Sequence, residues 1–174
     1  KVIDSDHFIA EWRAIAKAST YFSPTDWKER IGAEKKQLNI PVKESDRISK
    51  KLSLKSYEGG YKFMVVWLAE YMKAPTANKL LKLLEEPHKK TLIILITNNF
   101  DNILGTILSR TQLVKLNIPQ DEEIADYLVA NYGVNSESAK DAARLADGNV
   151  SQAVHIAKNE NPDASNLETF SSLM

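Results

Sequence analysis

The sequence contains no cysteine, and this absence excludes a disulfide framework, a thiolate nucleophile and zinc sites built on cysteine. It also has no net charge, because 23 lysines and arginines stand against 23 aspartates and glutamates. A general electrostatic attraction to nucleic acid or to an acidic membrane is therefore not expected of the surface as a whole. No apolar run approaches the ~18 residues that a membrane-spanning helix needs, so we expect no membrane contact.

Glycine is also scarce, and the six glycines form no phosphate-binding loop, which needs clustered glycines followed by Lys and Ser or Thr. The nearest approach, Gly59-Gly60-Tyr61-Lys62, is better explained as a turn before a strand. The three histidines, His7, His88 and His155, are isolated from one another, so we expect no metal site. No Gly-x-Ser-x-Gly motif and no obvious Ser/His/Asp set is present.

The length and composition are those of an ordinary globular protein. With 174 residues, of which 43% are hydrophobic and 26% charged, the chain can bury a real core as one domain, or as a moderate domain with a small appendage. It begins with Lys1 and shows no signal-peptide pattern, so we expect a piece of something longer.

The first third of the chain predicts helices. Apolar residues at helical spacing indicate a helix over 5–18. Ser23-Pro24-Thr25-Asp26 combines a capping hydroxyl, a proline and an acid, which is typical of a helix start. Residues 38–42 predict at most a short edge strand, because Pro41 lacks an N–H group. A further helix is expected over 44–54.

The middle of the chain predicts an α/β unit. Residues 61–68 and 91–97 are apolar runs typical of parallel strands covered on both faces. A leucine-rich helix lies between them, after Pro75 and before Pro87, so a right-handed crossover is the simplest arrangement. A short helix or turn is expected within 103–110, and a third strand over 112–118.

The pattern is purely helical after Pro119. Apolar residues predict three short helices, which end at Gly133, at Gly148 and near Lys158. The alanine-rich middle helix indicates close packing. Residues 159–165 predict a polar linker, and Leu167, Phe170 and Leu173 the start of another helix.

Three blocks of this sequence resemble the bacterial DNA polymerase III clamp-loader subunits, which belong to the AAA+ superfamily. The first runs from Leu52 to Lys62, the second is Ala77-Asn-Lys-Leu-Leu-Lys-Leu-Leu-Glu-Glu-Pro87, and the third is Thr106-Ile-Leu-Ser-Arg-Thr-Gln112. The resemblance implies a partial AAA+ parallel sheet with flanking helices over 1–118, a three-helix lid over 119–158, and a linker with the start of a helical collar over 159–174. The family's P-loop and cysteine-rich metal module are expected upstream of Lys1.

Two departures from the ATPase members make the chain similar to the non-hydrolysing delta-prime type. Where those members carry an Asp-Glu pair at the end of a strand, this sequence has Trp67-Leu68, which cannot coordinate Mg²⁺ or polarise water. Where they carry an arginine in the third lid helix, it has Ser151. The alternative is an active gamma/tau-type ATPase that uses Glu70 as a displaced acid. A helicase-like or recombination AAA+ module is a weaker option.

The family feature that is retained is Arg110. In the family, this Ser-Arg pair supplies an arginine finger to ATP on the neighbouring subunit, and here Ser109 precedes the arginine and Thr111 replaces the usual cysteine. A planar, permanently charged guanidinium suits this role because it can bridge phosphate oxygens. The alternative is a purely structural role, as a surface arginine that the dipole of a helix end favours. The resemblance implies that ATP and Mg²⁺ bind to the neighbour and that this fragment binds no cofactor.

Two weaker candidates complete the set. Thr97 and Asn98 end the second strand, where ATPases of the family sense the γ-phosphate; the alternative is a polar strand end that hydrogen-bonds to the next loop. Lys79, Lys82 and the pair Lys89-Lys90 form either a basic strip toward DNA phosphates or a solvated face.

The resemblance also implies partners and a location. We expect a hetero-pentamer with gamma/tau and delta subunits that loads the sliding clamp on primed DNA during replication, in the cytoplasm of a bacterium.

Overall fold

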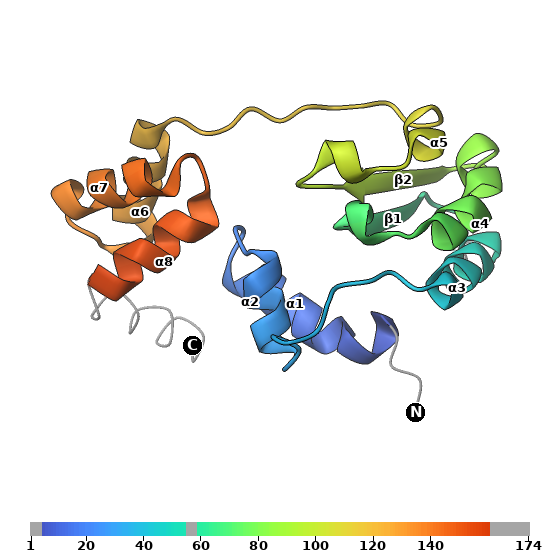
Figure 1. Cartoon of the computed structure of the whole chain (residues 1–174), viewed down its shortest axis with the longest axis horizontal. Coiled ribbons are helices and arrows are strands. Elements are labelled where there is room, and N and C mark those ends of the chain that lie inside the picture. Colours follow the sequence, from blue (N-terminus) through green and yellow to red (C-terminus); the bar gives the residue numbers. More distant parts are fainter. Residues whose placement is uncertain (1–4, 55–58, 161–174) are drawn as a thin grey trace. The chain divides into compact units, whose positions relative to one another are not determined.

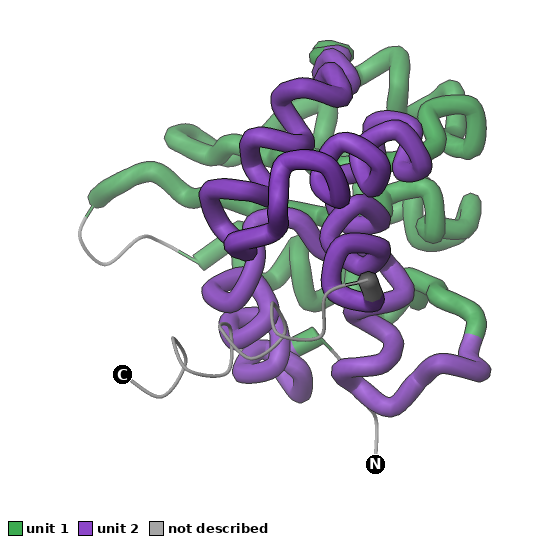
Figure 2. The backbone as a smooth tube through the Cα atoms, turned by 90° about the vertical axis from the view of Figure 1, so that its left-hand side faces the viewer, with its two compact units in different colours: residues 1–5, 37–114 green, residues 6–36, 115–174 purple. Residues whose placement is uncertain are grey.

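The computed structural model describes residues 5–54 and 59–160. It divides into two compact units (Figure 2): residue 5 with residues 37–114, and residues 6–36 with residues 115–160. The N-terminal helices, predicted to be part of the α/β core, group with the three-helix part in this division. The boundaries at 118 and 158 stay predictions, and residues 161–174, with the predicted further helix, lie outside the described residues.

The first unit contains the predicted strand–helix–strand arrangement (Figure 1). Strand β1 (Lys62–Trp67) and strand β2 (Thr91–Ile96) pair in parallel, with Phe63 opposite Leu92 and Trp67 opposite Ile96. Helix α4 (Ala74–Glu85) connects them, and α3 (Val42–Ser53) precedes β1. The predicted parallel α/β class is confirmed.

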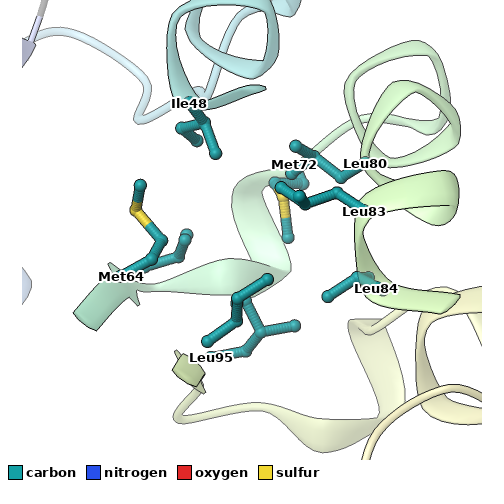
Figure 3. Close-up of a pocket in the computed structure, with 9 residues that line it drawn as sticks. Ile48, Met64, Met72, Leu80, Leu83, Leu84 and Leu95 are labelled. Atoms are coloured by element: carbon teal, nitrogen blue, oxygen red, sulfur yellow. The ribbon is translucent and has the colours of Figure 1, made fainter. Parts of the chain in front are cut away.

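The core of this unit lies on one face of the sheet. Helices α3 and α4 pack together. Their apolar side chains meet those of the strands around a small cavity (Figure 3), which is lined by Ile48, Met64, Val66, Met72, Leu80, Leu83, Leu84, Ile93 and Leu95. Burial of this apolar surface is what stabilises the unit.

The opposite face of the sheet is exposed within the described residues. Phe63 is 67% exposed on β1, and Leu92 and Ile94 are 48% and 40% exposed on β2. Within the described residues, the prediction that both strands are covered on both faces is therefore wrong. Both apolar runs are strands, as predicted, but α3 and α4 meet them on one face, around the cavity.

Two predicted strands differ from the structure. Residues 38–42 contribute one isolated bridge, Ile40 to Met72, because the chain turns into α3 directly after Pro41. Residues 112–118 form no strand, and Val114 and Leu116 are 71% and 89% exposed. A strand needs a hydrogen-bonded neighbour, and the sheet of the described residues holds β1 and β2 alone.

The second unit is helical. It contains α1 (Ile9–Ala18) and α2 (Pro24–Arg30), after a 3₁₀ turn at Ser5–Phe8, and α6 (Asp121–Tyr132), α7 (Ser136–Ala146) and α8 (Val150–Glu160). The predicted cap is present: the backbone N–H of Asp26 donates to Ser23 Oγ at 3.2 Å, and that of Ser23 donates to Asp26 Oδ2 at 2.5 Å. Four alanines of α7 are buried, which confirms close packing.

No helix of the described residues is both long and apolar enough to cross a bilayer.

Candidate functional site

Arg110 lies two residues after the end of the short helix α5 (Gly105–Leu108), and its side chain is 31% exposed. Its Nε donates to Oε1 of Glu85 at 2.6 Å, and Nη2 forms an ion pair with the same oxygen. Its Nη1 donates to the carbonyl oxygen of Thr106 at 3.0 Å and to Ser109 Oγ at 3.1 Å. Three nitrogens of the guanidinium are thus oriented by oxygens of the same chain.

The local fold explains why the arginine stays at this place. Ile107, 1% exposed, anchors α5, and α5 packs against α4. Thr111, the next residue, donates its hydroxyl to the carbonyl of Ile107 at 3.1 Å. Carbonyl groups at a helix C-terminus attract a cation, so the end of α5 favours the guanidinium.

The carboxyl end of β1 carries no acid. Trp67 is half-buried, and Leu68 is 4% exposed with left-handed backbone angles of φ 58° and ψ 52°. A bulky side chain in this conformation costs about 1–2 kcal/mol, and burial of the leucine in the core offsets that cost. Trp67 and Leu68 have the chemistry of packing residues.

Glu70 connects the carboxyl ends of the two strands. It lies in a 3₁₀ turn (Ala69–Tyr71), and its Oε1 accepts the backbone N–H of Asn98 at 3.3 Å. Its Oε2 is buried and has no hydrogen-bond partner within the described part of the chain. Thr97 Oγ1 accepts the backbone N–H of Asn99 at 3.1 Å. The structure thus brings Glu70 to the predicted sensor position, which sequence reasoning missed although parallel strands end at one edge.

Ser151 makes a structural contact within the helical unit. It is 9% exposed on α8, and its hydroxyl donates to Oδ2 of Asp26 on α2 at 3.0 Å. His155, one turn further along, binds Oδ1 of the same carboxylate at 2.6 Å. A serine hydroxyl that is used in this way ties two helices together.

Half of the predicted basic strip is engaged within the chain. Lys79 pairs with Asp46 of α3 at 2.7 Å, and Lys90 donates to the carbonyl of Gly59 at 2.8 Å. Lys82 and Lys89 are exposed. Among residues 5–54 and 59–160, no three His, Asp or Glu side chains gather as a metal site.

Sequence reasoning did not single out Glu85, which contacts Arg110 more closely than any other residue does. The signal was present, since Glu85 belongs to the Leu-Glu-Glu-Pro motif that closes α4. What the pattern left open was which of two adjacent glutamates faces α5.

The comparisons with known proteins agree with this fold. The family model of the DNA polymerase III delta subunit matches residues 23–120. The DNA polymerase III subunit delta' of Bacillus subtilis (strain 168) is 32% identical over 123 residues, which are 71% of this chain and 37% of the relative. The subunit delta' of Escherichia coli (strain K12) is 28% identical over 131 residues, which are 75% of this chain and 39% of the relative. The chain therefore spans less than half of these relatives.

A solved structure is also similar to this chain. A DNA polymerase III gamma subunit-related protein from Thermotoga maritima matches with a TM-score of 0.50 and 28% identity, over 63% of this chain and 40% of that chain. The family model covers more than half of the present sequence, and the similar curated proteins are delta' subunits. By these matches, the chain belongs to the DNA polymerase III delta-subunit family of clamp-loader proteins.

Proposed function

We propose that these residues are part of a non-hydrolysing, delta-prime-type clamp-loader subunit that supplies Arg110 in trans to ATP and Mg²⁺ on a neighbouring subunit. The observation that carries the proposal is the placement of Arg110: partly exposed, at the end of a short anchored helix, with Nη1 of its guanidinium held by Thr106 and Ser109. An oriented arginine can stabilise the charge that develops on a transferred phosphoryl group, an effect of about 10³- to 10⁵-fold in rate.

The carboxyl end of β1 supports the non-hydrolysing role. Trp67 and Leu68 offer no ligand for Mg²⁺, and one oxygen of Glu70 accepts a hydrogen bond from the backbone of Asn98. The names of the relatives, DNA polymerase III subunit delta', support a place in a DNA polymerase III assembly. We propose that this assembly is a cytoplasmic hetero-pentamer with gamma/tau and delta subunits, which opens the sliding clamp and loads it on primed DNA.

Replacement of Arg110 in a reconstituted loader tests this function. With Arg110→Ala in the whole subunit, the assembly should form, but ATP turnover stimulated by clamp and primed DNA should fall at least ~10-fold. Arg110→Lys should rescue poorly, because an ammonium lacks the planar fork. Arg144→Ala is the matched control, since Arg144 is an exposed arginine whose ion pair is to Asp141 of the same helix. Unchanged turnover with Arg110→Ala refutes the proposal.

The second candidate is an ATP-hydrolysing gamma/tau-type subunit. The observation in its favour is Glu70, a carboxylate at the strand ends with one buried oxygen that lacks a partner in the described residues. ATP hydrolysis by the whole subunit alone, abolished by Glu70→Gln, would favour this candidate. Our first proposal expects no ATP turnover by the isolated subunit, whether residue 70 is glutamate or glutamine.

A further inference from the structure

One oxygen of Glu85 occupies an edge of the Arg110 guanidinium. Oε1 contacts both Nε, at 2.6 Å, and Nη2. Arginine binds carboxylates and phosphates through such pairs of parallel N–H groups. The carboxylate of Glu85 therefore lies where a phosphate oxygen would bind this edge.

The other side of the guanidinium is also in use. Nη1 donates to the carbonyl oxygen of Thr106 and to Ser109 Oγ. The carbonyl belongs to α5 and moves only with that helix. The side chain of Glu85 can rotate away more easily than this backbone carbonyl can. A phosphate that approaches Arg110 would consequently displace the carboxylate of Glu85.

Exposure makes that exchange inexpensive. The side chains of Arg110 and Glu85 are 31% and 46% exposed. Exposed ion pairs change an equilibrium by only about 1.5- to 5-fold, because water competes for both partners. A triphosphate carries more charge than a carboxylate, so it can displace Glu85 without large cost.

We propose that Glu85 is a positioning residue that holds Arg110 in the free subunit and competes with the neighbour's triphosphate for its guanidinium. Assembly then exchanges one carboxylate oxygen for phosphate oxygens at the Nε/Nη2 edge. The contacts to Thr106 and Ser109 keep the arginine at the end of α5 during the exchange. This inference rests on the proposed function of Arg110.

The test replaces Glu85 by Gln in the whole subunit, within the reconstituted loader. Glutamine keeps the shape but removes the charge, so the apparent KM for ATP should fall about 2- to 5-fold while kcat stays within about 2-fold. The difference in apparent KM between the Glu85→Gln loader and the unsubstituted loader should narrow as salt is raised, because the ion pair of Arg110 with Glu85 is exposed and salt screens it. Glu86→Gln is the matched control: Glu86 is adjacent and exposed, and it should leave KM unchanged.

A spectroscopic measurement checks the contact itself. In the free whole subunit with ¹⁵N-labelled arginine, the Nε–H signal of Arg110 should be protected from exchange with water in the parent and in Glu86→Gln, and less protected in Glu85→Gln, where the hydrogen bond loses its charge. A loss of kcat at constant KM with Glu85→Gln, an unchanged KM, or an unprotected signal in the parent each overturns the inference. If Arg110→Ala itself leaves turnover unchanged, the proposed function has failed instead.

Discussion

The imidazole Nε2 of His155 lies 2.6 Å from Oδ1 of Asp26, although 129 positions separate them in the sequence. The same carboxylate accepts the hydroxyl of Ser151 and the backbone N–H of Ser23. One acid therefore caps its own helix, α2, and joins it to α8. This contact lies within the unit that groups the N-terminal helices with the three C-terminal ones.

The stability contributed by Asp26 should depend on pH. Burial raises the pKa of Asp26, but hydrogen bonds from Ser23, His155 and Ser151 lower it, and the net pKa is below its usual value. A group with a lowered folded-state pKa stabilises the fold above its unfolded pKa of about 3.9, and this stability is lost as pH falls through the folded value.

The substitution Asp26→Asn should lower the free energy of unfolding by about 1–3 kcal/mol at pH 7. Urea unfolding between pH 3 and pH 7 measures the free energy of unfolding of both proteins. The difference between Asp26→Asn and the unsubstituted protein should shrink below about pH 4. A gap that is constant with pH contradicts the assignment.

Truncation of Leu80 should reveal how tightly the α/β core is packed. Leu80 is 4% exposed and lines the apolar cavity between α4 and the sheet. Leu80→Ala enlarges that cavity, so the free energy of unfolding should fall by about 2–5 kcal/mol. Lys82→Ala, on the exposed side of the same helix, should stay within about 0.5 kcal/mol. Equal midpoints of the two variants in urea would show that the cavity wall is not part of the cooperative core.

Substitution by alanine should lower the stability at Gly148 but not at Gly105. Gly148 has a φ of +79°, and a Cβ there would lie 2.0 Å from Cγ2 of Ile118. Gly148→Ala should therefore lower stability by about 1–3 kcal/mol, through backbone strain and displacement of Ile118. Gly105 begins α5 with open space around it, and Gly105→Ala should leave stability unchanged or raise it by up to about 1 kcal/mol. Thermal unfolding measures both, and a tolerated Gly148→Ala would contradict the close approach.

Much of the secondary structure could be predicted from local signals. Helix ends were predictable from three such signals: the reciprocal cap of Ser23 and Asp26, the prolines near the two ends of α4, and the glycine after α6. Each signal acts within a few residues, so the local sequence is sufficient to locate the helix end. Residues 112–118 show where such reasoning ends. Their apolar composition predicts a strand, but a strand exists only beside a partner, and composition does not supply one.

The candidate site shows the same division. Arg110 and the loss of acids at Trp67 and Leu68 could be read from the sequence, because the chemistry of a guanidinium or of an apolar side chain belongs to the residue itself. The roles of Ser151 and Glu70 could not, because a hydroxyl or a carboxylate acts through whatever lies within hydrogen-bond reach.

By itself, the sequence determined the positions of the helices and of the two strands, the family, and the choice of Arg110 as the candidate site residue. Each of these depends on residue types at short spacing. Only the tertiary structure decided that Glu85 rather than Glu86 binds Arg110, that Asp26 joins α2 to α8, and that one face of the sheet is exposed. Such contacts arise from packing between segments far apart in the chain, where a shift of one residue places a different side chain at the contact.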